Sequence, residues 1–359
     1  MGKGAAADLK GNDDKISIIV TKRSRTVRFC FLRGFMNIHE ERLKDLQHLL
    51  KKEKLDALVV SRPLEQGFLT GYRMDGYLLL VSRTAAWAFM PKMFIDQFRE
   101  KVNFVSPSAP DDQPEAAISK IRENKFRKTA FEPETESYLR GRFWRKKGLV
   151  EFKGLTAGLR AVKEAGEISI LRKSCHIAHK TFGLIKPRIK PGRTELSVSR
   201  EMEDLMQAMG AKGPSFNLIV GFGPDSALPH HESSDRPLRK NSAVLLDWGC
   251  VYNGYCSDIT RTYFYGKPDA EFKKVYAIVD AAQKAGVKKV KAGVKTFEID
   301  KACRAYIADA GYGQYFTHGT GHGVGLEIHE APTLNTKSKE TLRTGMAVTV
   351  EPGIYLYGK

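Results

Sequence analysis

One segment, residues 243–265, constrains the fold of this chain more than any other. Two runs rich in strand-forming residues flank the dipeptide Asn253-Gly254. Asn-Gly is the strongest short signal for a β-hairpin, because a type I′ turn needs positive φ at both central positions. If these two residues form the loop, Tyr252 pairs with Tyr255 and the register of both strands is fixed. The segment therefore predicts an antiparallel hairpin with a defined pairing.

That register brings two carboxylates, Asp247 and Asp258, to one face of the hairpin. Asp247 lies opposite Thr260, and Asp258 precedes Thr260 by two positions, so the carboxylates are diagonal neighbours within reach of a common ion. Two carboxylates on an apolar hairpin repel each other unless positive charge lies between them, and a pair of divalent metal ions supplies it. In the alternative, each aspartate bonds a turn amide or a nearby arginine such as Arg261.

A second segment, residues 318–330, holds His318, His322 and His329 among several glycines. Imidazole is the commonest transition-metal ligand, and glycine lets the backbone approach a ligand closely. A lone histidine is typical of an ordinary surface or core position. Because three of the chain's nine histidines lie here, the segment favours a functional site.

Two further residues, Glu351 and His230, lie in short motifs elsewhere in the chain. Glu351 ends an apolar run and is followed by a Pro-Gly turn, while His230 lies in a polar stretch before the hairpin. A carboxylate at a strand end is a metal ligand or simply a solvated strand terminus. His230 is likewise a site residue or part of a polar surface loop.

Taken together and in order, these pieces resemble the pita-bread metallopeptidases of the proline dipeptidase (prolidase) and Xaa-Pro aminopeptidase (aminopeptidase P) type. Each piece alone is weak, but all of them in order are highly specific, and the resemblance covers the chain from Met36 to its end. The matching pieces are Ile219-Val220-Gly221-Phe222-Gly223 with Pro229-His230, Asp247 with Ser257-Asp258-Ile259-Thr260-Arg261-Thr262, Gly321-His322-Gly323-Val324-Gly325 with His329-Glu330, and Glu351-Pro352-Gly353-Ile354-Tyr355.

The resemblance implies an α+β fold, with a C-terminal pita-bread (creatinase/aminopeptidase) domain behind an N-terminal α/β creatinase-like domain. The additional N-terminal domain argues against a methionine aminopeptidase. Creatinases keep the fold but lack the ligand set found here, so the ligands favour a peptidase. The implied metal ligands are Asp247, Asp258, His322 and Glu351.

Roles follow from the same resemblance. Asp258 would bridge two divalent ions, with Asp247 on one ion and His322 on the other. The implied catalytic residues are His230, His318, His329 and Glu351. The histidines would line the substrate site and steady the tetrahedral intermediate, while Glu351 would take a proton from the attacking water.

The expected activity is hydrolysis of Xaa-Pro dipeptides, or of the N-terminal Xaa-Pro bond of peptides, by a metal-bound hydroxide. Manganese is the expected metal, with cobalt, zinc or iron as alternatives, because mixed carboxylate and imidazole ligation suits all of them. A proline-containing peptide is the expected partner, and a homodimer the expected assembly. The alternative is a non-catalytic pita-bread module that binds protein or nucleic acid.

One departure from the family pattern affects the metal site. Relatives carry a second glutamate, near an arginine and further along the chain, that bridges both metals. Here only eight residues follow Glu351 (359 − 351 = 8). We therefore expect the C-terminal end of the catalytic domain to be missing, the second metal site to be weakened, and the activity of this chain to be uncertain.

Three parts are expected along the chain. Residues 1–35 read as a disordered extension or a mis-assigned start, with Met36 as the initiator, because an amphipathic helix pattern begins there. Residues 36–155 alternate strands and helices, as in a small α/β domain. Residues 156–359 form the catalytic domain, in which helices near 195–209 and 297–310 follow similar glycine-containing turns, suggesting two related halves.

Net charge and cysteine content limit the partners and the cellular compartment expected for the protein. The net charge of +18 would suit a nucleic-acid-binding module, but the basic residues are spread along the chain, so nucleic acid is not expected as a partner. Five cysteines without a C-x-x-C pair indicate a reducing compartment. No apolar run is long enough to span a membrane and no signal peptide is seen, so a cytoplasmic location without a membrane partner is expected.

Overall fold

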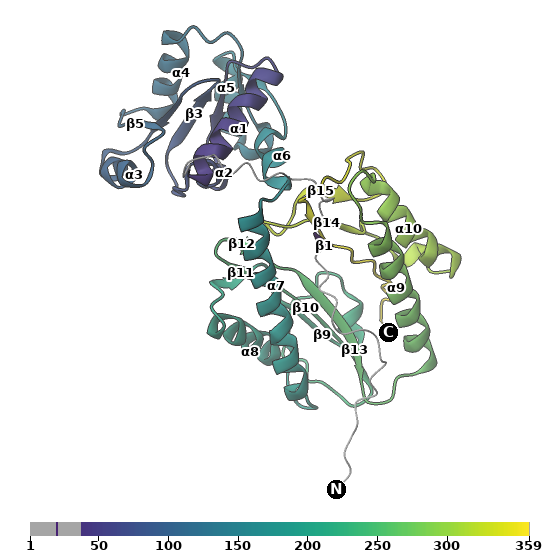
Figure 1. Cartoon of the computed structure of the whole chain (residues 1–359). Helices are drawn as coiled ribbons and strands as arrows, with labels where there is room; N and C mark the ends of the chain where they lie inside the picture. Colours follow the sequence, from purple (N-terminus) through teal and green to yellow (C-terminus); the bar gives the residue numbers. More distant parts are fainter. Residues whose placement is uncertain (1–18, 21–36, 359) are drawn as a thin grey trace. The chain divides into compact units, whose positions relative to one another are not determined.

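The computed structural model describes residues 19–20 and 37–358, and these form two compact units (Figure 1). The N-terminal unit contains the described residues up to Arg160. The C-terminal unit contains residues 161–358 together with the short strand at 19–20. Every residue proposed above as a ligand or catalytic group belongs to the C-terminal unit.

The N-terminal unit is a mixed sheet with helices packed on it. Its strands are β2 (Ala57–Val60), β3 (Leu78–Ser82), β4 (Ala86–Phe89), β5 (Ser106–Ser108), β6 (Thr129–Phe131) and β7 (Val150–Glu151). Its helices are α1 (Ile38–Lys52), α2 (Pro63–Thr70), η1 (Lys92–Phe94), α3 (Ile95–Lys101), α4 (Gln113–Glu123), η2 (Pro133–Thr135) and α5 (Tyr138–Lys146), and α6 (Leu155–Ala161) leads out of it. The strand order is β5-β4-β3-β2-β6-β7, with β2–β3 and β3–β4 antiparallel and the other pairs parallel.

The amphipathic helix expected near Met36 is confirmed as α1. The Asn37 side chain accepts a hydrogen bond from the backbone N–H of His39, which caps the first turn. Leu43, Leu46 and Leu50 are buried, because their spacing puts them on the stripe that faces the sheet. The alternation of strands and helices expected after it is likewise found, with β2, β3, β4 and β6 among the strands.

The C-terminal unit packs long helices against small sheets. Its strands are β1 (Ile19–Val20), β8 (Gly213–Pro214), β9 (Ile219–Phe222), β10 (Ser242–Trp248), β11 (Cys250–Tyr252), β12 (Tyr255–Cys256), β13 (Ile259–Tyr265), β14 (Gly321–Gly323), β15 (Glu330–Leu334) and β16 (Ala347–Val348). Its helices are α7 (Ala165–Ile185), η3 (Lys186–Arg188), α8 (Glu195–Ala208), η4 (Gly223–Ala227), α9 (Ala270–Lys289), α10 (Thr296–Asp309) and η5 (Gly313–Tyr315). The sheet orders are β13-β10-β9, β12-β11-β8 and β1-β16-β14-β15.

A buried aromatic pair ties the helices to the hairpin. The rings of Phe182 on α7 and Trp248 on β10 stack with centroids 5.7 Å apart, and the indole N–H donates to the Ala178 carbonyl at 2.9 Å. Trp248 is fully buried, so its polar atom needs that partner. This packing holds β10, which carries Asp247, against a rigid helix.

The hairpin expected from Asn253-Gly254 is confirmed with its predicted register. Both turn residues have positive φ, 46° and 84°, and Tyr252 pairs with Tyr255. The ladder is interrupted near Gly249, where a Cβ atom would collide with the Ser257 carbonyl oxygen. Beyond this interruption the pairing continues in register, so the hairpin is divided into β10–β11 and β12–β13.

The two halves of the C-terminal unit repeat the same local structure. Helices α8 and α10 begin 101 residues apart (296 − 195). Before each helix, a glycine N–H donates to a later carbonyl, from Gly192 to Leu238 at 3.1 Å and from Gly293 to Leu342 at 2.8 Å. The repeat inferred from the sequence therefore corresponds to repeated backbone contacts.

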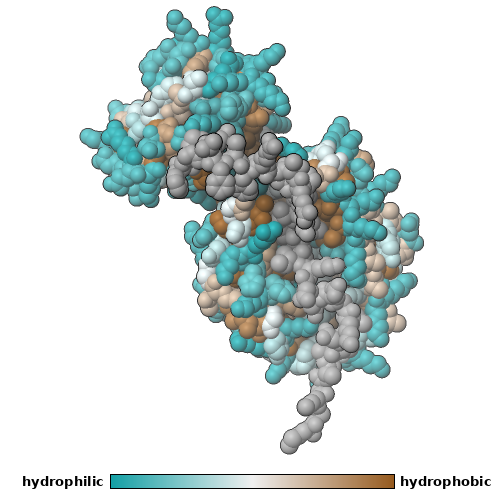
Figure 2. Space-filling view, in the orientation of Figure 1, coloured by the Kyte–Doolittle hydropathy of each residue, from teal (hydrophilic) through white to brown (hydrophobic). Residues whose placement is uncertain are grey.

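Within the segment expected to be an extension, the structure describes only β1, which pairs antiparallel with β16. The remainder of residues 1–35 lies outside the described residues. Figure 2 shows hydrophilic residues spread over the visible face of both units, with apolar residues in several separate areas. The basic clusters at 145–147 and 288–289 are exposed, as expected for solvated surface.

Candidate metal centre

The two hairpin carboxylates border one cavity of about 1370 Å³ in the C-terminal unit. Asp247 lies on β10 opposite Thr260, and the Thr260 hydroxyl donates to its carboxylate at 3.0 Å. Asp258 lies between β12 and β13, where the ladder is interrupted. Arg261, the arginine considered as an alternative partner, donates to the Thr260 carbonyl at 2.8 Å.

Asp258 meets two side chains that come from distant parts of the sequence. His322 lies on β14, and its Nε2 is 3.4 Å from Asp258 Oδ2 and 3.0 Å from Glu351 Oε1. Ligand atoms of these three residues all lie within 4.8 Å of one another. A carboxylate, an imidazole and a second carboxylate thus converge on one point beside Asp247.

Backbone and hydroxyl groups orient these side chains. The Nδ1 of His322 bonds its neighbouring Gly323 carbonyl at 3.0 Å, which turns Nε2 toward the carboxylates. The Thr349 hydroxyl donates to Glu351 Oε1 at 2.6 Å and accepts from the His322 backbone N–H at 2.9 Å. Metal-binding histidines typically use the second ring nitrogen in this way, because it fixes the tautomer and the ring orientation.

Burial and mutual repulsion of the carboxylates change the pKa values of the cluster. Burial, and then the charges of Asp258 and Glu351, raises the pKa of Asp247 well above its ordinary value. Burial also raises the pKa of Asp258, although its bond to His322 opposes the change. Burial alone would lower the pKa of His322, but its bonds to Asp258 and Glu351 raise it to about 10. Positive charge is therefore favoured at this point.

This donor set fits divalent metal ions. Buried carboxylates repel one another, a cation between them offsets that repulsion, and oxygen and imidazole ligands together suit the first-row transition metals. The raised pKa of His322 shows that positive charge is favoured between Asp258 and Glu351, whose oxygens lie 3.4 and 3.0 Å from its Nε2. A divalent ion would supply that positive charge, with His322 binding it as the neutral imidazole.

The remaining histidines border the same cavity. The His329 ring lies edge-on to His322, with centroids 4.3 Å apart, and burial followed by the charge of His322 lowers its pKa. The His318 Nε2 lies 2.9 Å from the Tyr355 hydroxyl. His230 is exposed at the edge of the cavity. The structure thus brings all seven candidate residues to one cavity.

The glycines on either side of His322 leave room for the backbone of neighbouring segments. A Cβ atom at Gly321 would collide with the Thr349 carbonyl oxygen, and one at Gly323 with the Ala331 carbonyl oxygen. The sequence interpretation was that glycine lets the backbone approach a ligand. The structure shows instead that these two glycines let β14 fit tightly between the chain segments on either side.

Several residues that shape the site carry no role in the sequence interpretation. Thr260 and Tyr355 lie inside motifs that were identified, and strand pairing could have indicated Thr260 as the partner of Asp247. Thr349 alternates with Glu351 on one strand-like run. Glu195, which is fully buried at the start of α8, gives no signal in the sequence beyond its position at a helix N-terminus.

The fold and the cluster of carboxylates and imidazoles together define a metal-dependent hydrolase. The family model "Metallopeptidase family M24" matches residues 169–359, and the model "Creatinase/Prolidase N-terminal domain" matches residues 42–162. The chain belongs to the M24 metallopeptidase family, of the prolidase type, and has its pita-bread fold. This membership implies divalent metal ions, and the non-catalytic alternative is not favoured.

Relatives of known name support the same assignment. The chain is 33% identical over 326 residues to an Xaa-Pro dipeptidase of Pyrococcus horikoshii, covering 89% of this chain and 92% of the relative. A solved Xaa-Pro dipeptidase from Bacillus anthracis is 35% identical with a TM-score of 0.84, covering 89% of this chain and 91% of that one. The solved dipeptidase PepE from Mycobacterium ulcerans is 30% identical with a TM-score of 0.85, covering 91% and 92%.

A search for membrane-spanning elements among residues 37–358 is negative: their helices are too short or too polar to cross a bilayer.

Proposed function

We propose that this chain hydrolyses Xaa-Pro peptide bonds, with Xaa-Pro dipeptides as the preferred substrates. The observation that carries the proposal is the convergence of Asp258, His322 and Glu351 beside Asp247, within a cavity that His230, His318 and His329 also border. Relatives named as Xaa-Pro dipeptidases match this chain over most of its length. Their name supplies the substrate class, and the cavity is large enough for a short peptide.

Asp247, Asp258, His322 and Glu351 are the proposed metal ligands, and manganese is the proposed metal. Bound divalent ions supply Lewis acidity and lower the pKa of a coordinated water. Asp258 Oδ2 lies 3.4 Å from His322 Nε2, and the charge of Asp258 raises the pKa of Asp247, so Asp258 is the carboxylate that we propose two ions would share.

Glu351 is the proposed general base. Although burial opposes it, the bond from His322 lowers the pKa of Glu351, so its carboxylate is ionised near neutral pH. His322 and Thr349 both bond Oε1. Oε2 is therefore the oxygen that we propose accepts the proton of an attacking water.

The three histidines are proposed to hold the substrate and its developing negative charge. Because the pKa of His329 is lowered, its ring is neutral near pH 7 and offers one N–H to an oxyanion. His318 is fixed by its bonds to the Gly319 carbonyl and the Tyr355 hydroxyl. His230, at the edge of the cavity, is placed to meet the part of the substrate that faces solvent.

We also propose a cellular location and an oligomeric state. The four cysteines among residues 37–358 are all free and buried, which suits a reducing compartment, and we therefore place the protein in the cytoplasm. A homodimer is the proposed assembly. Sedimentation velocity of the purified chain tests it, and a single species at the monomer mass would contradict it.

The direct test of function uses metal-stripped protein reloaded with manganese, cobalt, zinc or iron. An Xaa-Pro dipeptide, a longer peptide that begins with Xaa-Pro and an Xaa-Ala dipeptide are assayed in parallel. We expect hydrolysis of the first substrate, slower hydrolysis of the second, and none of the third. Tight metal binding without hydrolysis of either proline substrate would contradict the proposal.

A further inference from the structure

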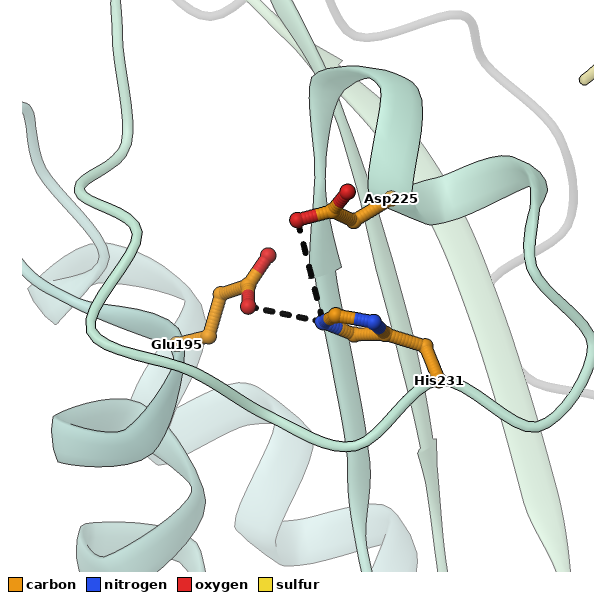
Figure 3. A group of neighbouring side chains, drawn as sticks. All are labelled: Glu195, Asp225 and His231. Carbon is orange, nitrogen blue, oxygen red and sulfur yellow. Dashed lines mark hydrogen bonds and ion pairs between the residues drawn. The ribbon is translucent and has the colours of Figure 1, made fainter. Parts of the chain in front are cut away.

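A second cluster of ionisable side chains lies outside the metal centre, at the start of α8 (Figure 3). Glu195, the first residue of that helix, is fully buried. Its Oε2 lies 2.7 Å from His231 Nε2, and His231 Nε2 lies 3.9 Å from Asp225 Oδ2. Glu195 thus reaches from the helix into the loop that follows β9.

These residues fit a hydrogen-bonded network better than a metal site. Both oxygens of Glu195 already accept bonds from protein donors: Oε1 from the Phe222 backbone N–H at 2.8 Å, and Oε2 from His231 and from the Ser234 N–H and hydroxyl. Arg236 bonds Asp225 and supplies a positive charge there. A cation would have to displace these donors.

Glu195 bonds both ends of the segment between Phe222 and Ser234. Phe222 is the last residue of β9 and Ser234 lies twelve residues later (234 − 222), so a single buried carboxylate holds the two ends of the intervening segment. The segment contains Pro229 and His230, the motif that borders the cavity. His231, the residue directly after His230, turns its ring to Glu195.

We propose that Glu195 and His231 are positioning residues that fix the loop carrying His230 and so hold the His230 imidazole at the edge of the active-site cavity. The catalytic part of this inference rests on the proposed function; the geometric part does not. A site residue on an exposed loop needs such support, because a displacement of about 1 Å can lower a rate by about 10²-fold.

The other half of the C-terminal unit holds a histidine loop by similar means. Asp300 on α10 is fully buried and accepts bonds from the Thr320 N–H and hydroxyl at 3.1 and 2.9 Å. Arg304, paired with Asp300, donates to the carbonyls of Phe316 and His318. A buried carboxylate near the start of each repeated helix therefore secures a loop that carries one of the cavity histidines.

A double-mutant cycle tests the catalytic part. His231→Ala should lower kcat/KM for an Xaa-Pro dipeptide about tenfold, mainly through kcat, with unchanged metal content and cooperative unfolding. His231→Gln, which keeps a donor toward Glu195, should recover part of that loss. In a His230→Ala background, adding His231→Ala should change kcat/KM by less than about twofold, because coupled residues act as a unit. An equal loss in both backgrounds would overturn the proposal.

A matched control comes from the same helix. Glu201 lies on the solvent side of α8 and pairs with Arg188 and Arg193. Glu201→Gln makes the same chemical change as Glu195→Gln without touching the loop, and it should leave kcat/KM unchanged. A loss comparable to that of Glu195→Gln would show that the helix tolerates neither change, and would overturn the specific role of Glu195.

The geometric part has a readout that needs no activity. With ¹³C-labelled histidine, the His230 ring signal is assigned from its disappearance in His230→Ala. In the metal-free chain, Glu195→Gln should shift or split that signal, whereas Glu201→Gln should leave it in place. If the wild-type chain hydrolyses no proline peptide, the proposed function fails while this measurement still decides the inference. An unmoved His230 signal in Glu195→Gln refutes it.

Discussion

Raising the pH from about 5 to about 8 should destabilise the N-terminal unit through one carboxyl group, and Glu132→Gln should remove that effect. Glu132 follows β6 and is 3% exposed. Its oxygens accept bonds from the Thr156 backbone N–H at 2.9 Å and the Thr156 hydroxyl at 2.5 Å. Burial outweighs these two bonds and raises the pKa of Glu132 from 4.5 to about 7.

The direction and size of the change in unfolding free energy follow from the difference between the folded and unfolded pKa of Glu132. A carboxyl group with a higher pKa in the folded state binds its proton more tightly there, so its contribution to stability is intact below pH 4.5. That contribution is lost progressively as the pH rises from 4.5 to about 7, and the loss is then complete. At about 1.4 kcal/mol per pH unit, the free energy of unfolding falls by about 3 kcal/mol.

The assay must report the N-terminal unit alone, because a chain of two units need not unfold in one step. Hydrogen exchange of the β2 and β6 amides does so, since slow exchange there reflects opening of this sheet. We expect the stability advantage of Glu132→Gln over the wild type to grow by about 3 kcal/mol between the two pH values. Glu123→Gln, an exposed change on α4, is the matched control and should show no such growth. If the Glu132→Gln difference is the same at both pH values, the burial argument is wrong.

The remaining predictions concern the metal centre. Asp258→Asn should abolish metal binding and hydrolysis together while the far-ultraviolet circular dichroism is retained; normal binding of both ions, measured by mass spectrometry of metals, would contradict the assignment. His322→Ala should weaken metal affinity in isothermal titration, because Nε2 is the imidazole atom that faces Asp258 and Glu351. His329→Ala should keep the metal and lower kcat by about 10²–10³-fold, the usual contribution of a donor to an oxyanion. Isothermal titration of the metal-free chain with manganese should show tight, saturable binding, and a chain that binds no manganese would contradict the proposed metal site.

Local rules were sufficient for the hairpin. The Asn253-Gly254 turn fixes positive φ at two consecutive positions, and the pairing of Asp247 with Thr260 then follows from counting. Helices with a clear apolar period were also predictable, as α1, α8 and α10 show. Short helices such as α2 and α3 were not, because two turns contain too few apolar positions to define a period.

The cluster of proposed metal ligands could be anticipated only through the resemblance to a family. Asp258, His322 and Glu351 span 93 positions (351 − 258), and neither composition nor local periodicity brings such residues together. What the sequence does contain is a set of short motifs, each ambiguous, whose order is specific. The structure adds the missing step, because β14 and the strand-like run that ends in Glu351 bond to each other through Thr349 and bring His322 and Glu351, both proposed ligands, to Asp258 on the hairpin.

The support around the site was not predictable at all, and the reason is physical. Glu195 looks in sequence like an ordinary acidic residue at a helix N-terminus, where it would interact favourably with the helix dipole in water. Its burial depends on a loop of a dozen residues folding back over it, which no local rule anticipates. Catalytic side chains are selected for chemistry that leaves a recognisable residue type, whereas the groups that hold them are selected for geometry. Positioning residues of this kind must therefore be found in the structure, by asking which hydrogen bonds hold the chain next to a site residue, as the bond between Glu195 and His231, the neighbour of His230, illustrates.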